Sequence, residues 1–480
     1  MFAKIQRIHF VGIGGIGMSG IAEVLLNLGY QISGSDLRNS AVTERLAALG
    51  ATTFEGHVAA NIAGADVVVT SSAIPVDNPE VAEARRLHVP VIQRAEMLAE
   101  LMRLKYGIAI AGMHGKTTTT SMVAAVLAAG GLDPTVVVGG RVDAMGSNAR
   151  LGKSQYLVAE ADESDRSFLK LSPILSVVTN IDREHMDCYR DMRDVRRTFL
   201  EFMERVPFYG VVVGCNDDAV LRRLLAHVHR RVTTYGTSPG SDFLIRMGAS
   251  PVGSSFAGSP LVAGEHGPLV RFQVTYKEKD LGEFTLHVPG VHNVLNATAA
   301  IAVGTALDIP VDQIRSALDG FRGVDRRFQL KGNVGGVSVI DDYGHHPTEI
   351  RATLAAARQC GFRRVHVIFQ PHRFTRTRDL MDEFATAFAD ADTLCLLDIY
   401  PASEKPIEGI TAATLVNRIA GAGKRGVAYA PSFSDAVVTV AALAEPGDMV
   451  LTLGAGSVSQ LGAMILQKLE AKSYAPRATR

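Results

Sequence analysis

A glycine-rich segment in the first third of the chain has residue types that can bind phosphate. It consists of Gly112, Met113, His114, Gly115, Lys116, Thr117 and Thr118. It lies between a short apolar run and a run of helical composition at 121–129, so backbone N–H groups and a helix N-terminus would face an anion together. Lys116 could reach the terminal phosphates of a nucleotide, and Thr117 could bind Mg²⁺. The G-x-x-G-K-T spacing is two residues shorter than the general phosphate-loop pattern, and a turn with a solvated lysine is the alternative.

Acidic residues follow the next two predicted strands. Glu160 opens the segment EADESD after a strand at 156–159, and a strand at 175–178 is followed by TNID and then by EHMD, which contains His185. Carboxylates at a strand end beside a phosphate loop are common Mg²⁺ ligands, and a neutral imidazole could bind or orient a second ion. Any one of these charges could be an ordinary solvated loop residue. Two successive strands that end in acids at one sheet edge favour a metal site.

A second glycine turn lies near the amino terminus, where the sequence GIGGIG separates a predicted strand from a predicted helix. In such turns the N–H groups at the start of the helix bind a diphosphate, and an acid at the end of the second strand meets a ribose hydroxyl. NAD and a UDP-sugar both satisfy this pattern, and so does a turn that only packs a helix tightly on a strand. The candidate residues are Gly12, Gly14, Gly15, Ile16, Gly17, Met18, Ser19 and Asp36.

Polar clusters in the last 200 residues supply further candidates. The amide in PGVHNVLN could bind a base edge or cap the following helix. DRRF lies beside a predicted domain boundary, and a strand at 337–340 runs into DDYGHHP. Two arginines three residues apart in QPHRFTRT could form a fork for a carboxylate or phosphate, although exposed arginines usually solvate a surface. The candidates are Asn293, Arg327, Asp342, Tyr343, Arg373 and Arg376.

The elements that must position these residues follow one pattern. Short β-branched runs alternate with longer Ala- and Leu-rich runs of helical periodicity, which predicts an α/β fold with parallel sheets built from βαβ units. Ligands bind at the carboxyl ends of the strands in such sheets. The predicted strands lie at 8–11, 67–69, 108–110, 156–158, 175–178, 211–213, 365–368, 393–397 and 449–452.

The length of 480 residues fits three domains of about 150 residues each. We expect a Rossmann-like domain at 1–104, a central phosphate-loop ATPase domain at 105–321 and a second Rossmann-like domain at 322–480. A Gly/Ser/Pro-rich stretch at 238–267 and a β-like segment at 269–288 would be an embellishment of the central domain. Glycine-rich strands around 330–340 mark the second boundary.

The composition excludes several classes of partner. Lys plus Arg and Asp plus Glu each number 49, so no net charge steers the protein to nucleic acid or to an anionic membrane. The four cysteines are scattered and match no zinc or disulfide pattern. There is no signal-peptide pattern, and the apolar runs are shorter than the roughly 20 residues that span a bilayer. We expect a cytoplasmic monomer or weak homodimer.

The motifs together resemble those of the Mur ligases, the ATP-dependent amide-forming enzymes of peptidoglycan precursor synthesis. The similarity runs from GIGGIGMSGIA through GMHGKTTTT, EADESDRSFL, TNIDREHMD, GVHNVLNA and DRRF to DDYGHHPTE and QPHRFTRT. The short phosphate loop is the form found in this family. The first and the last two segments are most similar to the members that add L-alanine.

This resemblance implies a ligase with three substrates. The first domain would bind UDP-N-acetylmuramate, the second ATP and two Mg²⁺ ions, and the third L-alanine, with an acyl phosphate as intermediate. The resemblance places Lys116 at the transferred phosphate, Thr117 and Glu160 on one Mg²⁺ and His185 on the second. It further implies adenine, ribose and phosphate contacts for Asn293, Asp342 and Arg327, and an alanine site at Tyr343, Arg373 and Arg376. Unlike several relatives, the predicted helix at 195–205 has no lysine that could be carbamylated.

Three alternatives remain at this stage. An NAD-dependent dehydrogenase would use the amino-terminal turn but leave Lys116 and the third domain unexplained. A non-catalytic nucleotide-binding switch would explain the phosphate loop but not the arginine pair. A ligase similar to folylpolyglutamate synthetase would share the ATP chemistry but not the UDP-type domain.

Overall fold

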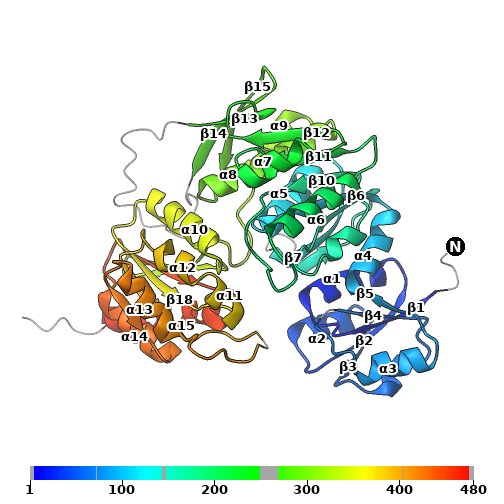
Figure 1. Cartoon of the computed structure of the whole chain (residues 1–480), viewed down its shortest axis with the longest axis horizontal. Helices are drawn as coiled ribbons and strands as arrows, with labels where there is room; N and C mark the ends of the chain where they lie inside the picture. Colours follow the sequence, from blue (N-terminus) through cyan, green and yellow to red (C-terminus); the bar gives the residue numbers. More distant parts are fainter. Residues whose placement is uncertain (1–4, 72, 143–146, 249–268, 403, 475–480) are drawn as a thin grey trace, which may run out of the picture. The chain divides into compact units, whose positions relative to one another are not determined.

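Three β-sheets form the framework of the described part of the chain, and Figure 1 labels many of their strands. This computed structural model describes residues 5–71, 73–142, 147–248, 269–402 and 404–474. The chain divides into two compact units, which comprise Met1–Arg246 with Gln273–Glu283 and Leu295–Leu318, and Met247–Phe272 with Phe284–Val294 and Asp319–Arg480. The sheets are mainly parallel, which confirms the predicted α/β class, whereas the boundaries at 104 and 321 stay predictions.

The first sheet is parallel and has the strand order β3-β2-β1-β4-β5. Its strands are β1 (Arg7–Val11), β2 (Gln31–Asp36), β3 (Thr52–Glu55), β4 (Val67–Thr70) and β5 (Val91–Gln93). The helices are α1 (Ile16–Asn27), α2 (Ala41–Ala48), α3 (Pro79–Arg86), α4 (Arg94–Arg103) and the short 3₁₀ helix η1 (Ala59–Ile62). β2 and β4 lie on either side of β1, so the chain crosses from one half of the sheet to the other between β3 and β4. In open α/β sheets, ligands bind at such a switch point.

The second sheet has the order β15-β14-β13-β12-β11-β10-β6-β9-β7-β8. Its strands are β6 (Tyr106–Ala111), β7 (Thr135–Val142), β8 (Ser147–Arg150), β9 (Tyr156–Glu160), β10 (Leu175–Val178), β11 (Val211–Cys215), β12 (Val232–Gly236), β13 (Phe243–Met247), β14 (Val270–Tyr276) and β15 (Lys279–Leu286). The helices are α5 (Lys116–Ala129), α6 (Met192–Glu204), α7 (Ala219–Leu225), α8 (Val291–Ala306), α9 (Val311–Asp319) and the 3₁₀ helix η3 (Ser167–Lys170).

Two parts of this sheet differ from the sequence-based expectation. The helix after the phosphate loop begins at Lys116 itself, five residues before the predicted run at Ser121. The stretch 238–267 contains the strand β13, because Phe243 and Leu244 pair with β12 although glycine, serine and proline surround them. Residues 249–268 of that stretch lie outside the described part of the chain. The β-like segment at 269–288 forms β14 and β15, as predicted.

The third sheet has the order β16-β17-β21-β18-β19-β20, and only β16 and β17 are antiparallel among its pairs. Its strands are β16 (Gln329–Val334), β17 (Val337–Asp342), β18 (Val365–Phe369), β19 (Thr393–Leu396), β20 (Val427–Tyr429) and β21 (Met449–Leu453). The helices are α10 (Pro347–Gln359), α11 (Phe374–Asp379), α12 (Met381–Ala387), α13 (Ala412–Gly421), α14 (Phe433–Leu443), α15 (Leu461–Tyr474) and the 3₁₀ helix η4 (Ser457–Gln460).

This sheet separates two apolar cores, because successive strand side chains point to opposite faces. Ile340 and Val367 pack with α10, α12 and α13 on one face, and Val339 and Ile368 pack with α14 and α15 on the other. The apolar runs that predicted these strands are therefore buried on both faces of the sheet, which is usual for parallel sheets covered by helices on both sides.

The register brings the predicted clusters to common sheet edges. In the second sheet, Ile110 pairs with Glu160 and Ala111 with Val178, so the phosphate loop starts between the two acidic strand ends. In the third sheet, Asp342 and Phe369 both pair with Leu453. No helix among the described residues is both long and apolar enough to cross a membrane.

Candidate active site

The backbone of the phosphate loop has a shape that only glycine tolerates at two positions. Gly112 has φ +129°, and a Cβ there would lie 2.0 Å from Thr179 Oγ1. Gly115 has φ +81°, and a Cβ there would lie 2.7 Å from Asn296 Oδ1. The loop is thus held between the end of β10 and helix α8, with Lys116 as the first residue of α5.

The ammonium group of Lys116 is held by backbone carbonyls and by a carboxylate. Its Nζ donates to Gly112 O at 2.6 Å, to Met113 O at 3.3 Å and to Glu163 Oε1 at 2.6 Å. Burial alone would lower the pKa of Lys116, but the carboxylates of Glu163, Asp162 and Glu184 raise it. The lysine is therefore a permanent cation beside the loop, as binding of phosphate requires.

Glu163 lies in the EADESD segment, and the sequence alone did not distinguish it from the neighbouring acids. Its side chain is 1% exposed, and its Oε2 has no hydrogen-bond partner among the described residues. Its backbone carbonyl accepts a bond from Tyr189 Oη at 2.6 Å, and Arg166 lies over the Tyr189 ring. Arg166 in turn pairs with Asp194 at the start of α6. A rigid frame thus aims a buried carboxylate at Lys116.

His185 and Glu163, which come from two different loops, lie close together. His185 Nε2 is 3.6 Å from Glu163 Oε1 and 4.0 Å from Glu184 Oε1. His185 has φ +56°, an unfavourable left-handed conformation that turns the chain after Glu184. Glu160, at the end of β9, lines a cavity together with Lys116. Thr117 is the second residue of α5 and is partly exposed.

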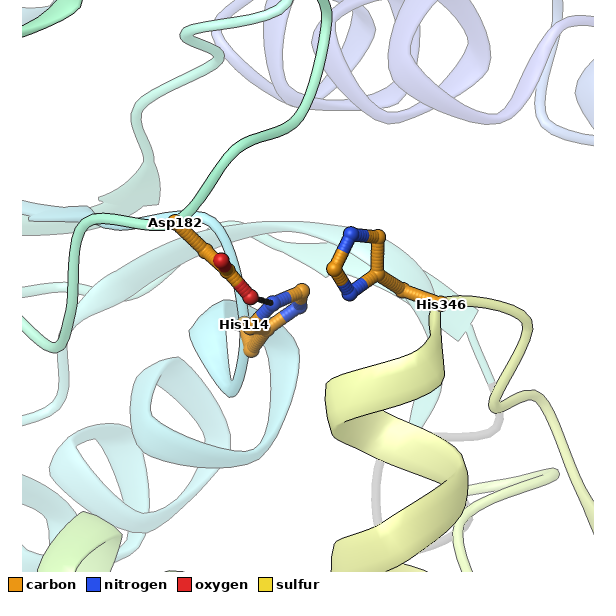
Figure 2. A group of neighbouring side chains, drawn as sticks. All are labelled: His114, Asp182 and His346. Carbon is orange, nitrogen blue, oxygen red and sulfur yellow. Dashed lines mark hydrogen bonds and ion pairs between the residues drawn. The ribbon is translucent and has the colours of Figure 1, made fainter. Parts of the chain in front are cut away.

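His114 connects the phosphate loop to the end of β10. Its ring Nε2 lies 2.9 Å from Asp182 Oδ2, as Figure 2 shows, and its Nδ1 is 3.8 Å from Glu184 Oε2. Its backbone N–H donates to Asn180 Oδ1, and its carbonyl accepts from Thr179 Oγ1 at 2.6 Å. The side chains of Met113 and Thr118, two further predicted contacts, are buried, so they shape the loop from within.

The amino-terminal glycine turn is closed by Asp36. The Gly14 N–H donates to Asp36 Oδ2 at 2.8 Å, so this carboxylate holds the turn in place. A Cβ on Gly14 would lie 2.8 Å from the same oxygen, and Gly12 has φ +81°. Met18 and Ser19 have buried side chains, and their N–H groups donate to Gly15 O within α1. The Ile16 side chain lies outside the described part of the structure.

A cavity of about 150 Å³ lies between this glycine turn and the phosphate loop. Gly17 and Arg94 line it on one side, and Lys116, Glu160 and Asp162 line it on the other. The remaining lining side chains are almost all apolar. Charged groups of both signs thus meet in a small apolar space between the two predicted substrate sites.

Arg94, the first residue of α4, joins these two sides. Its Nη2 donates to Asp162 Oδ2 at 2.8 Å. A Cβ on Gly17 would come within 2.3 Å of Arg94 Nη1, so the last glycine of the turn makes room for the guanidinium. The sequence does not indicate a role for Arg94, because RAEMLAEL is typical of any amphipathic helix. Its place at the carboxyl end of β5 is the signal that could have found it.

In the third sheet, Asp342 stabilises the turn in which it lies. Its carboxylate accepts from Phe328 N and from Gly344 N, each at 2.8 Å. Burial raises the pKa of Asp342, although Arg327 nearby opposes this shift. Arg327 lies over the Tyr343 ring at 5.1 Å and 3.4 Å from Glu349 Oε1. The structure therefore brings three predicted residues together, Arg327, Asp342 and Tyr343.

Aromatic and imidazole rings connect Tyr343 to the arginine pair. Tyr343 contacts His345 edge-on, His345 contacts His372, and His372 stacks on Tyr400 with an interplanar angle of 10°. Arg376 Nη1 lies 3.0 Å from His372 O and 3.1 Å from its Nδ1. His372 lies within the QPHRFTRT motif, but the spacing of that motif predicts a role only for its arginines.

Arg373 is held by its backbone. It has φ +72°, and its N–H donates to Tyr400 O at 2.8 Å. Asn293, the remaining predicted contact, is buried and donates from Nδ2 to Pro289 O at 2.7 Å, which ties the start of α8 to the preceding turn. Next to it, burial and the charge of Arg327 lower the pKa of His292 to about 4, so this imidazole is neutral at physiological pH.

Comparison with protein families gives three matches along the chain. Residues 7–106 match the Mur ligase family catalytic domain, residues 110–304 match the Mur ligase middle domain, and residues 326–456 match the Mur ligase glutamate ligase domain.

Several proteins are similar over nearly their whole length. The UDP-N-acetylmuramate–L-alanine ligase of Koribacter versatilis is 72% identical, over 99% of this chain and 100% of the relative. That of Acidobacterium capsulatum is 64% identical, over 98% and 99%. Among solved structures, the UDP-N-acetylmuramate–alanine ligase of Thermotoga maritima superimposes with a TM-score of 0.78 and 29% identity, covering 97% of this chain and 99% of that one. A murein peptide ligase of Psychrobacter arcticus, with a TM-score of 0.66 and 24% identity over 97% and 99%, shares the fold.

Proposed function

This chain belongs to the Mur ligase family, and from that we propose that it joins L-alanine to the carboxylate of UDP-N-acetylmuramate, with conversion of ATP to ADP and phosphate. The full-length similarity to ligases that add L-alanine carries this proposal. The enzyme is an ATP-dependent acid–amino-acid ligase of peptidoglycan synthesis. We assign UDP-N-acetylmuramate to residues 1–104, ATP to 105–321 and L-alanine to 322–480.

The phosphate loop supports the first half of the reaction. A carboxylate is a poor acyl donor, and phosphoryl transfer from ATP turns it into an acyl phosphate that an amine can attack. Lys116 is a buried, charged donor at the start of α5, where it would stabilise the charge that develops on the transferred phosphoryl group. The N–H groups of the loop would hold the other phosphates in line.

The site fits a divalent cation. Glu163 Oε2 is a buried carboxylate oxygen without a hydrogen-bond partner in the described chain, and His185 and Glu160 lie near the same loop. Thr117 and Glu160 would hold one Mg²⁺, and His185 would hold a second. When bound, such ions reduce the repulsion between the substrate carboxylate and the phosphates of ATP.

The polar cluster of the third sheet supports the second half of the reaction. Arg373 and Arg376 would bind the carboxylate of alanine, which leaves its amine directed at the acyl phosphate, and Tyr343 would form a wall of this site. Arg327 and Asp342 would meet the nucleotide, with Asn293 near the adenine. The Tyr343, His345 and His372 contacts support a single pre-organised site for the amino acid.

A four-component assay tests this function. Phosphate release should require UDP-N-acetylmuramate, L-alanine, ATP and Mg²⁺ together, and mass spectrometry should find the UDP-muramoyl product heavier by one alanyl residue. Calorimetry with the full chain should detect binding of UDP-N-acetylmuramate and no binding of NAD. Phosphate release that persists without the UDP-sugar or alanine would contradict the proposal, and so would tight binding of NAD without a response to the UDP-sugar.

A further inference from the structure

The Arg94 side chain joins the amino-terminal glycine turn to the loop that follows β9. Its Nη1 lies against Gly17, and its Nη2 donates to Asp162 at 2.8 Å. The same guanidinium lines the cavity that also contains Lys116 and Glu160. Arg94 is therefore a cation on the path between the two substrate sites.

The proposed substrate has its own anion on this path. A UDP-sugar acid that places its diphosphate at the glycine turn must direct its carboxylate towards Lys116, because that is where ATP would be attacked. We propose that Arg94 binds this carboxylate and positions it for phosphoryl transfer. The inference rests on the function proposed above and adds a substrate-binding residue to it.

The guanidinium has enough donors for this second partner. Asp162 accepts from Nη2, whereas a guanidinium carries five N–H donors in one plane. Arg94 can thus keep its bond to Asp162 while other donors face a planar carboxylate, which is the geometry that favours arginine over lysine.

Asp162 has a defined task in this arrangement. The Asp162 carboxylate accepts from Ser164 Oγ at 2.6 Å as well as from Arg94. The loop after β9 therefore holds Asp162 in place, and Asp162 holds Arg94 in place. The remaining, mainly apolar lining of the cavity lowers the local polarity, which would strengthen a contact between a guanidinium and a carboxylate.

Calorimetry without ATP separates the carboxylate from the rest of the ligand. The probes are UDP-N-acetylmuramate and UDP-N-acetylglucosamine, which has the same diphosphate and sugar but no lactyl carboxylate. We expect Arg94→Ala to weaken binding of UDP-N-acetylmuramate about tenfold or more, and to change binding of UDP-N-acetylglucosamine less than about twofold. Equal losses for both ligands, or no loss for either, would overturn the proposal.

A matched control and a conservative variant guard against a structural effect. Arg103 lies at the other end of α4 and pairs with Glu100 on the surface, so Arg103→Ala should bind both ligands as the unaltered chain does. Arg94→Gln keeps part of the aliphatic stem and a polar, uncharged end group, and it can replace Arg94→Ala if that variant does not fold. In addition, the unaltered chain should bind UDP-N-acetylmuramate about tenfold more tightly than UDP-N-acetylglucosamine, and equal affinities would reject the inference.

A double variant distinguishes direct binding from charge neutralisation. If Arg94 only cancels the charge of Asp162, then Arg94→Ala combined with Asp162→Asn should regain the original affinity for UDP-N-acetylmuramate. If Arg94 contacts the carboxylate, the double variant stays as weak as Arg94→Ala. Recovery to within about threefold would overturn direct binding.

Failure of this inference and failure of the proposed function give different results. If the unaltered chain forms no product in the four-component assay, the function is wrong. If it forms product while Arg94→Ala and Arg94→Gln bind UDP-N-acetylmuramate normally, only the role of Arg94 is wrong.

Discussion

Lys116 Nζ lies 2.6 Å from Glu163 Oε1, so the cation of the phosphate loop is paired with a buried carboxylate of the same unit. A nucleotide phosphate that approaches Lys116 must compete with Glu163 for it. The carboxylate cannot swing away freely, because Tyr189 and the Arg166–Asp194 pair hold its loop. If Lys116 binds a nucleotide phosphate as proposed, Glu163 would therefore set how strongly it does so.

Removal of the Glu163 charge should strengthen binding of ATP in the absence of metal. We expect Glu163→Gln to lower the Kd for ATP in EDTA about threefold, because Lys116 loses its anionic partner. Isothermal calorimetry measures the change. Glu201→Gln, on the exposed side of α6, is the control. Unchanged or weaker binding in Glu163→Gln would show that the pair does not compete with phosphate.

Loss of Lys116 should abolish turnover without unfolding the chain. We expect Lys116→Ala to lower kcat at least about a hundredfold, which corresponds to roughly 3 kcal/mol of lost transition-state stabilisation. Phosphate release measures the rate, and circular dichroism checks the fold. Lys153→Ala, at an exposed position, should keep normal activity. Near-normal turnover in Lys116→Ala would reject its assignment to the transferred phosphate.

Much of this arrangement was predictable from the sequence, because parallel strands bring their carboxyl ends to one edge. That rule alone places Lys116 near Glu160, and the register of β6 with β9 agrees with it. The Lys116–Glu163 pair was not predictable, since it joins side chains 47 positions apart whose directions depend on packing around Tyr189. The Arg94–Asp162 pair spans 68 positions and has no local pattern.

Strand β13 was missed for a similar reason. Its neighbours are rich in glycine, serine and proline, and this local composition favours a loop. The pairing of Phe243 with Tyr235 and of Leu244 with Gly236 overrides that local preference. The ring of Phe243 also stacks on Tyr276, so β13 is stabilised by contacts that no short window of sequence contains.

The arginine pair should determine affinity for the amino acid and not for the nucleotide. We expect Arg373→Ala and Arg376→Ala each to raise KM for alanine about tenfold or more, with KM for ATP changed less than about twofold. Steady-state kinetics with each substrate varied in turn measures both. Arg378→Ala, on the same helix and paired with Asp379, is the matched control. If KM for ATP rises instead, these arginines belong to the nucleotide site.

A buried carboxylate at the opposite end of the third sheet should make its unit sensitive to acid. Burial opposes ionisation of Asp448, but hydrogen bonds from His366, the Glu445 N–H, Arg364 and Arg363 hold its pKa at about 2. Because the folded-state pKa lies below the ordinary value, this ionisation stabilises the fold above about pH 4, and the stabilisation is lost as pH falls towards 2.

The variant Asp448→Asn tests this linkage. At pH 7 it should lower the free energy of unfolding by about 2 kcal/mol, and its difference from the unaltered chain should shrink between pH 4 and pH 2. Urea titrations at several pH values measure this. Asp435→Asn, which removes an exposed carboxylate on α14, should change stability little. A difference that is independent of pH would mean that Asp448 acts through packing alone.

His185 and Arg373 both have a left-handed backbone conformation, which glycine adopts at lower cost than any other residue. At these two positions, the residue that best stabilises the fold therefore differs from the residue that we propose for the site. A side chain in that region costs about 1 kcal/mol or more relative to glycine. Replacement by glycine would thus favour the folded chain while it removes an imidazole or a guanidinium from the site. If His185 and Arg373 act as proposed, a screen that selects only for heat resistance would enrich inactive proteins at these codons, and thermostabilisation would have to leave both positions unchanged.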